Sequence, residues 1–169
     1  MLLKQHIVQL AEQSLFVSGF WVKTGVLEPR PHYILTDTVE QNLGDLARIV
    51  SLCNHPVLVQ GDTSVGKTSL VIYLANITGN TVVRVNNHEH TDIQLYIGSY
   101  TSDSSGRLVF KLALLAEAMQ AGSWVILDEL NLAPTGVLEA LNRASDNNRE
   151  LFIPETGHTI QAKPGFRIF

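Results

Sequence analysis

Several features that define common protein classes are scarce in this sequence of 169 residues. Cys53 is the single cysteine, which excludes an internal disulfide and suits a reducing compartment. No run of about eighteen apolar residues occurs, so neither a membrane-spanning helix nor a membrane partner is predicted. The 12 Lys and Arg residues are outnumbered by 16 Asp and Glu, and they are scattered singly. Direct sequence-specific binding of nucleic acid is therefore not expected.

Internal repeats and low-complexity segments are missing as well. The 45% hydrophobic and 17% charged residues are typical of a globular protein, and the length suits one domain with a buried core. What the sequence does contain is two motifs that point to nucleotide chemistry.

The first motif is a phosphate-binding loop. Residues 61–68 read GDTSVGKT, which fits the pattern GxxxxGK followed by Ser or Thr at every fixed position. In such a loop backbone amides curl around an anionic oxygen, Lys67 can reach the β- and γ-phosphates, and the Thr68 hydroxyl can ligate Mg²⁺. The chain is therefore predicted to bind a nucleoside triphosphate. The predicted nucleotide-binding residues are Gly61, Asp62, Thr63, Ser64, Val65, Gly66, Lys67, Thr68 and Ser69.

The flanks of this loop have the required order of strand, loop and helix. Residues 56–60 form a short apolar run that predicts a strand buried on both faces. Residues 69–76 carry apolar side chains at helical spacing. A chance match to the loop pattern is much less probable in this setting.

The second motif is an apolar strand that ends in two acids. Residues 124–127 read WVIL and are followed by Asp128 and Glu129, as expected of a buried parallel strand that carries carboxylates at its C-terminal end. It looks like a Walker B strand. Asp128 would hold Mg²⁺, and Glu129 would orient and deprotonate the attacking water.

The remaining chain predicts alternating strands and helices, so the fold class is α/β. The expected elements are an amphipathic helix at 1–12, an extended linker at 25–32, helices at 39–54, 112–120 and 134–145, a short helix at 93–97, strands at 81–85 and 107–111, a loop at 99–106, and a hairpin from 150–153 and 158–162. An apolar run at 166–169 predicts a further strand.

Longer strings around the motifs resemble a known family. NNHEHTD at 86–92, IGSY at 97–100, DELNLAP at 128–134, EALNR at 139–143 and NRELFIPET at 148–156 are similar to one ATPase module of the midasins, dynein-related AAA+ proteins of ribosome assembly. The resemblance runs from about residue 33 to residue 169, and it implies two regions: a preceding helix and linker at 1–32 and an AAA+ core at 33–169.

The resemblance implies a phosphate-loop AAA+ core with a parallel sheet flanked by helices, in a chain whose six modules form a ring. It also implies ATP-driven removal of assembly factors from large ribosomal subunit precursors in the nucleolus and nucleoplasm, with ATP and Mg²⁺ as ligands. By motif match, Lys67 and Thr68 carry over as phosphate and Mg²⁺ contacts, Asp128 as the metal partner and Glu129 as the catalytic carboxylate. Asn86 matches the polar position that restrains this glutamate in many AAA+ proteins.

The resemblance further implies that the sensor asparagine, arginine finger and helical lid would lie beyond Phe169. The chain is accordingly expected to be an incomplete module with negligible turnover by itself. Two alternatives stay open: a regulatory module that binds nucleotide without hydrolysis, and a bacterial MoxR-type or McrB-type AAA+ NTPase. The sequence has no NKxD motif, which excludes classical GTPases.

Overall fold

The computed structural model describes residues 13–30 and 32–169. The helix predicted for residues 1–12 lies outside the described residues. The chain divides into two compact units, the first ending at Val82 and the second beginning at Val83. Within the described ranges, no helix has the length and apolar character needed to cross a membrane.

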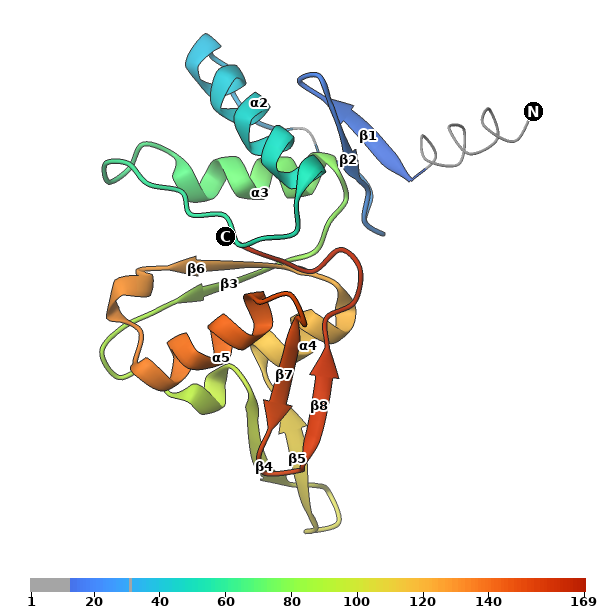
Figure 1. The fold of residues 1–169 in the computed structure, drawn as a ribbon, viewed down its shortest axis with the longest axis vertical. Helices are drawn as coiled ribbons and strands as arrows, with labels where there is room; N and C mark the ends of the chain where they lie inside the picture. Colours follow the sequence, from blue (N-terminus) through green and yellow to red (C-terminus); the bar gives the residue numbers. More distant parts are fainter. Residues whose placement is uncertain (1–12, 31) are drawn as a thin grey trace, which may run out of the picture. The chain divides into compact units, whose positions relative to one another are not determined.

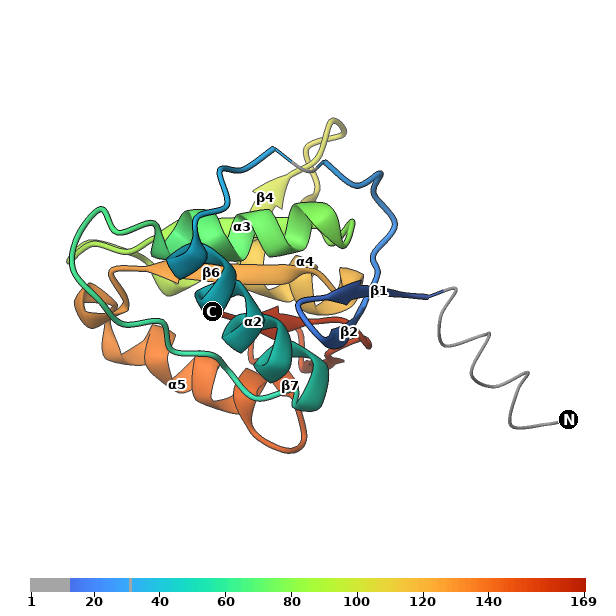
Figure 2. The same cartoon turned by 90° about the horizontal axis from the view of Figure 1, so that it is seen from above.

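The first unit begins with a β-hairpin that the sequence analysis did not predict. Strands β1 (Ser14–Val17) and β2 (Phe20–Lys23) pair antiparallel across a turn at Ser18 and Gly19, both with positive φ. Two-residue turns of this kind match the right-handed twist of the flanking strands. Val17 and Val22 are buried, whereas Phe16 and Trp21 are each 56% exposed on the other face. The hairpin lies beside helix α2 (Asp37–Leu52), as Figure 2 shows.

Helices α2 and α3 (Lys67–Ile77) follow the predicted ranges. Thr36 caps α2 by accepting a hydrogen bond from the Val39 amide, and Leu43, Leu46, Ala47 and Val50 form its buried face. Leu52 is 75% exposed because it falls in the last turn of α2, beyond these buried residues.

The segment after β2 is pinned to the C-terminal end of α3 by backbone hydrogen bonds. Gly25 N–H donates to the Thr78 carbonyl at 2.8 Å, and Leu27 N–H donates to the Gly79 carbonyl at 2.9 Å. The Asn80 amide donates to the Lys23 carbonyl at 3.0 Å. The predicted linker is extended, yet hydrogen bonds fix its course.

The predicted strand at 56–60 is wrong for the structure, since these residues carry no strand pairing. Val57 is buried, but Leu58 is 78% exposed. A strand exists through ladder hydrogen bonds to a neighbour, and an apolar run by itself does not supply that neighbour.

The second unit is built on a three-stranded sheet in the order β3–β6–β9. β3 (Val82–Asn86) and β6 (Trp124–Asp128) confirm two predicted strands and point the same way in Figure 1. β9 (Arg167–Ile168) pairs parallel with β6, and Phe169 continues the ladder by donating to the Val125 carbonyl at 2.9 Å. The α/β class with a parallel sheet is confirmed.

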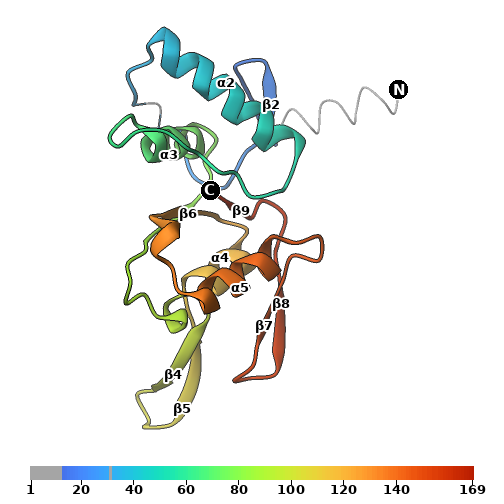
Figure 3. The same cartoon turned by 60° about the vertical axis from the view of Figure 1, so that its left-hand side comes forward.

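Helices α4 (Leu114–Ala121) and α5 (Thr135–Ser145) lie on the same side of β3 and β6 in Figures 1 and 3. Gly122 ends α4 in the left-handed region, a conformation that glycine adopts readily. Short 3₁₀ turns η1 (Ile93–Leu95) and η2 (Leu130–Leu132) follow strands β3 and β6 in the chain. The core lies between β6, the two helices and the hairpin β7–β8; its fully buried members include Tyr96, Leu115, Met119, Val125, Val137, Leu151 and Ile153.

Two antiparallel hairpins complete this unit. β7 (Glu150–Ile153) and β8 (His158–Gln161) confirm the predicted hairpin. β4 (Gly98–Ser102) and β5 (Leu108–Leu112) form the other one, so the loop predicted for 99–106 is wrong over its first residues. Ser and Gly there suggested a loop, but Tyr100 packs on Phe110 and its hydroxyl donates to the Glu155 carbonyl at 2.8 Å, which ties the two hairpins together.

We predict that Gly79→Ala loosens the docked segment. Gly79 has φ +67°, and a Cβ there would lie 2.2 Å from the Leu27 carbonyl oxygen. The left-handed conformation costs Ala about 1–2 kcal/mol, and the clash should add about 1–3 kcal/mol. Faster hydrogen exchange at the Gly25 and Leu27 amides is the expected readout.

Gly157→Ala is the matched control for this prediction. Gly157 has φ +68°, but a Cβ there would meet nothing within 4 Å. It should therefore carry the conformational cost alone and leave exchange at Leu27 unchanged. Equal exchange at Leu27 in both variants would contradict the proposed close contact.

Candidate nucleotide-binding site

The phosphate loop lies at the start of α3, and its backbone uses left-handed conformations. Ser64 has φ +65° and Gly66 has φ +89°. Gly66 is the N-cap of α3 and makes no side-chain cap, so no side chain from the cap position covers the positive end of the helix. A Cβ on Gly61 would contact the side chains of Val65 and Lys67, at 3.5 and 3.8 Å. The loop thus forms a backbone cradle in which positions 61 and 66 carry no side chain.

Lys67 turns back over this loop. Its ammonium donates to the Gly61 carbonyl at 2.8 Å and to the Asp62 carbonyl at 2.6 Å. These bonds use two of the three donors of an ammonium. They hold a fixed positive charge against the backbone cradle, where an anion would complete the charge balance.

Ser69 and Tyr33 fix the first turn of α3 from outside the loop. The Ser69 hydroxyl donates to the Gly66 carbonyl at 2.8 Å and lies 2.9 Å from the Tyr33 hydroxyl. Tyr33 also stacks on Tyr73 with ring centroids 4.8 Å apart. The sequence analysis did not identify Tyr33, because nothing local in the chain indicates that residue 33 returns to residue 69.

These residues fit a polyphosphate. An uncapped helix N-terminus, curled backbone and one ammonium are the groups that bind phosphate oxygens. Thr68 lies in the first turn of α3, half-buried, and its hydroxyl is a hard oxygen donor of the kind that Mg²⁺ accepts.

The acidic pair lies at the C-terminal end of β6 in the second unit. Asp128 is the last residue of the strand, and its carboxylate is paired with the Arg84 guanidinium of the neighbouring strand β3. The exposed side-chain fractions are 20% for Asp128 and 57% for Arg84. A divalent cation and Arg84 would therefore compete for the same carboxylate oxygens.

Glu129 follows in a left-handed conformation, with φ +52° and ψ +43°, and its side chain is exposed. Such a conformation is uncommon for a residue with a side chain and costs about 1–2 kcal/mol. Asn86, the last residue of β3, is exposed as well. Both side chains lie at the carboxyl ends of adjacent parallel strands, where open α/β sheets bind ligands.

Asn87 is the buried polar residue beside this pair. It is 2% exposed, and both its backbone N–H and its side-chain amide donate to the Asp128 carbonyl, at 3.0 and 2.9 Å. The Tyr96 hydroxyl donates to the other side-chain atom, Oδ1. Burial raises the pKa of Tyr96, with a smaller opposing effect from Asn87, so the hydroxyl stays protonated at neutral pH. The sequence offered an Asn-Asn pair but no signal to choose its second member.

The structure therefore groups the predicted residues in two sets. Residues 61–69 come together in the first unit, and Asn86, Asp128 and Glu129 come together in the second. His88 and His90 lie edge to face with ring centroids 6.5 Å apart. Within residues 13–30 and 32–169, no group of three or more His, Cys, Asp or Glu side chains is placed to hold a metal ion.

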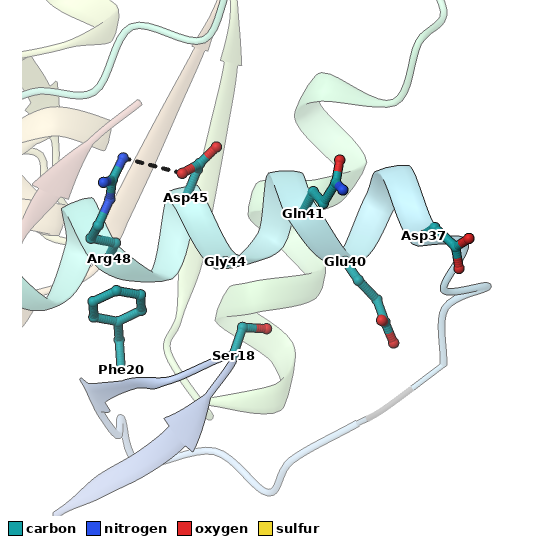
Figure 4. A pocket seen from close by; sticks show the side chains of 8 residues that line it. All are labelled: Ser18, Phe20, Asp37, Glu40, Gln41, Gly44, Asp45 and Arg48. Carbon is teal, nitrogen blue, oxygen red and sulfur yellow. Dashed lines mark hydrogen bonds and ion pairs between the residues drawn. The ribbon is translucent and has the colours of Figure 1, made fainter.

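A separate hollow of about 780 Å³ lies between the β1–β2 turn and α2 (Figure 4). Its acidic side chains Asp37, Glu40 and Asp45 are exposed, and Asp45 is bonded to Arg48 at 3.1 Å. All its charged groups face solvent, and none belongs to the phosphate loop. It does not contribute to the candidate site.

Two curated proteins are similar to most of this chain. The chain is 52% identical to a midasin of Dictyostelium discoideum over 162 residues, and 46% identical to a midasin of Giardia intestinalis over 138 residues. These alignments cover 94% and 81% of this chain but 3% of each midasin. The chain therefore spans only a small part of the length of these two relatives.

Other matches are more distant. An uncharacterized protein of Staphylococcus epidermidis is 30% identical over 133 residues, covering 76% of this chain and 51% of that protein. A putative ATPase from Cytophaga hutchinsonii superposes with a TM-score of 0.49 at 19% identity, over 64% of this chain and 31% of that chain, an overlap too partial to define the fold. Residues 56–169, which hold both motifs, match the family of AAA domains, dynein-related subfamily. The chain belongs to the dynein-related AAA ATPases.

Proposed function

We propose that the chain binds and hydrolyses ATP as one module of a midasin-like machine. The observation that carries this proposal is the backbone cradle at the uncapped start of α3 with the Lys67 ammonium held over it. Backbone amides and one fixed cation are suited to a polyphosphate and to few other ligands.

The second half of the proposal concerns the acids of β6. Bound Mg²⁺ would neutralise charge on the phosphates, with Thr68 and Asp128 as its protein oxygen donors. Glu129 would orient the attacking water and accept its proton. In phosphate-loop ATPases the loop and the acidic strand act on the same nucleotide, so the two sets of residues would work together.

The wider role follows from the resemblance to midasins. Neighbouring AAA+ modules in a six-module ring would be the direct partners, and the machine would release assembly factors from large ribosomal subunit precursors in the nucleus. The presence of Glu129 beside Asp128 supports a module that hydrolyses ATP, because a site that only stores nucleotide does not need a general base.

We predict that Lys67→Ala weakens nucleotide binding at this site at least tenfold. A charge-assisted hydrogen bond contributes about 1.5–3 kcal/mol, and about 1.4 kcal/mol is a factor of ten. Calorimetric titration of the full protein with ADP and Mg²⁺ should show one fewer high-affinity site. Lys23→Ala, which removes an exposed lysine from the same unit, should leave the count unchanged. An unchanged count for Lys67→Ala would refute the nucleotide site.

We predict that Glu129→Gln slows hydrolysis while ATP stays bound. The amide keeps the shape but cannot accept the proton, and general-base catalysis contributes about a hundredfold or more. Nucleotide extracted after a single turnover should contain one additional ATP per protein. This excess should vanish in the double variant with Lys67→Ala, which assigns it to this site. Glu139→Gln on α5 is the control for an exposed glutamate. ADP formed at the wild-type rate would show that Glu129 is not the base.

We predict that Arg84→Met lowers the free Mg²⁺ concentration needed for half-maximal hydrolysis. Arg84 is a cation paired with Asp128, so its removal takes away one competitor of the metal for this carboxylate. Because the pair is partly exposed, the shift should not exceed about fivefold. Arg107→Met, which breaks the exposed pair with Asp103 on the β4–β5 hairpin, should cause no shift. A higher Mg²⁺ requirement in Arg84→Met would mean that Arg84 assists the metal instead of competing with it.

A further inference from the structure

We infer that Asn87 and Tyr96 are positioning residues that set the direction of the Glu129 side chain. The inference rests on the proposed function, since it assigns to them a part in the hydrolysis that Glu129 performs. Neither residue reaches the reacting atoms. Both would act through the peptide group that joins Asp128 to Glu129.

The geometry begins with that peptide group. The Asp128 carbonyl and the Glu129 nitrogen belong to one rigid plane. Two donors of Asn87 hold the carbonyl, the backbone N–H at 3.0 Å and the side-chain amide at 2.9 Å. Fixing this plane fixes the position of the Glu129 nitrogen. The left-handed conformation of Glu129 then sets the direction of its side chain. An uncommon backbone conformation persists only where its surroundings hold it.

Tyr96 anchors the acceptor end of the Asn87 amide. A side-chain amide has a donor end and an acceptor end of nearly equal size. The Tyr96 hydroxyl donates to Oδ1, which leaves the amide nitrogen to face the Asp128 carbonyl. The Asp128 carbonyl can only accept, so it selects the amide nitrogen, and the hydroxyl holds the opposite end. Without this hydroxyl Oδ1 loses its partner, and the amide is no longer held in the position from which its nitrogen reaches the carbonyl.

Tyr96 itself is rigidly placed. Its side chain is fully buried in the core of the second unit. Its carbonyl accepts hydrogen bonds from the Leu115 and Ala116 amides, at 3.0 and 3.2 Å, which caps the start of α4. The next residues open strand β4, so the residue that orients Asn87 also forms the base of the β4–β5 hairpin. Hydrogen bonds therefore connect the first turn of α4 to Tyr96, Tyr96 to Asn87, and Asn87 to the Asp128 carbonyl that precedes Glu129. Tyr96 also connects this series to the β4–β5 hairpin.

The test is Tyr96→Phe in the full protein, with and without Glu129→Gln. Removing one hydroxyl should lower hydrolysis at this site about tenfold, because a misplaced catalytic group costs one to two orders of magnitude. Affinity for ADP and Mg²⁺ should stay within about twofold, because the phosphate loop is untouched. In the Glu129→Gln background Tyr96→Phe should have no further effect, since residues that act as one unit are non-additive.

Tyr100→Phe is the matched control. Its hydroxyl also donates to a backbone carbonyl, that of Glu155, but from the exposed part of the same hairpin. It should hydrolyse ATP at the wild-type rate. Asn87→Ala is a second variant, which should lose hydrolysis to the same extent as Tyr96→Phe. The double variant should lose no more than either single variant.

Three outcomes would overturn the inference. Wild-type hydrolysis in Tyr96→Phe would show that the hydroxyl positions nothing. An equal additional loss in the Glu129→Gln background would show an effect that does not pass through Glu129. A loss of ADP affinity would indicate a general structural role. Failure of the proposed function is seen separately, in the single Glu129→Gln variant, which would then leave hydrolysis unchanged.

Discussion

The central strand β6 is the constraint on which the second unit depends. It has hydrogen-bonded neighbours on both sides, and its residues from Trp124 to Leu127 are all buried. Burying apolar side chains of this size contributes about 1.5–3 kcal/mol each. The strand therefore has one stable register, and the position of Asp128 at its end is fixed by core packing.

The positive charges of Lys67, in the phosphate loop, and of Arg84, beside the acids of β6, are held in two different ways. Lys67 is bound to carbonyls of its own loop, so its ammonium is fixed before any ligand arrives. Arg84 instead neutralises Asp128 from the neighbouring strand. The first arrangement prepares a site for an anion, whereas the second occupies a site for a cation. A module of this design would bind phosphate readily, but Mg²⁺ could bind Asp128 only by replacing Arg84 as its partner.

Local pattern was sufficient wherever one segment determined its own structure. The helices predicted at 39–54 and 112–120 were found as α2 and α4, whose caps Thr36 and Gly122 are local interactions. It was not sufficient for residues 56–60, whose apolar character indicates burial but not a pairing partner. The prediction for residues 99–102 was wrong for the opposite reason. Their polar composition suggested a loop, but they pair with β5 and form a strand. The hairpin β1–β2 was not predicted, although Ser18 and Gly19 form its turn and a Ser-Gly pair is typical of turns.

The sequence by itself located the candidate site and the fold class: the loop at 61–68, the acids at 128 and 129 and the α/β class, because each depends on residues adjacent in the chain. Tertiary structure alone decided which side chains support that chemistry. Arg84 pairs with Asp128, which lies 44 positions away in the sequence, and Tyr33 contacts Ser69, 36 positions away. Tyr96 donates a buried hydrogen bond to Asn87. Such pairings follow from strand order and packing, and these are set by the whole core and not by any single segment.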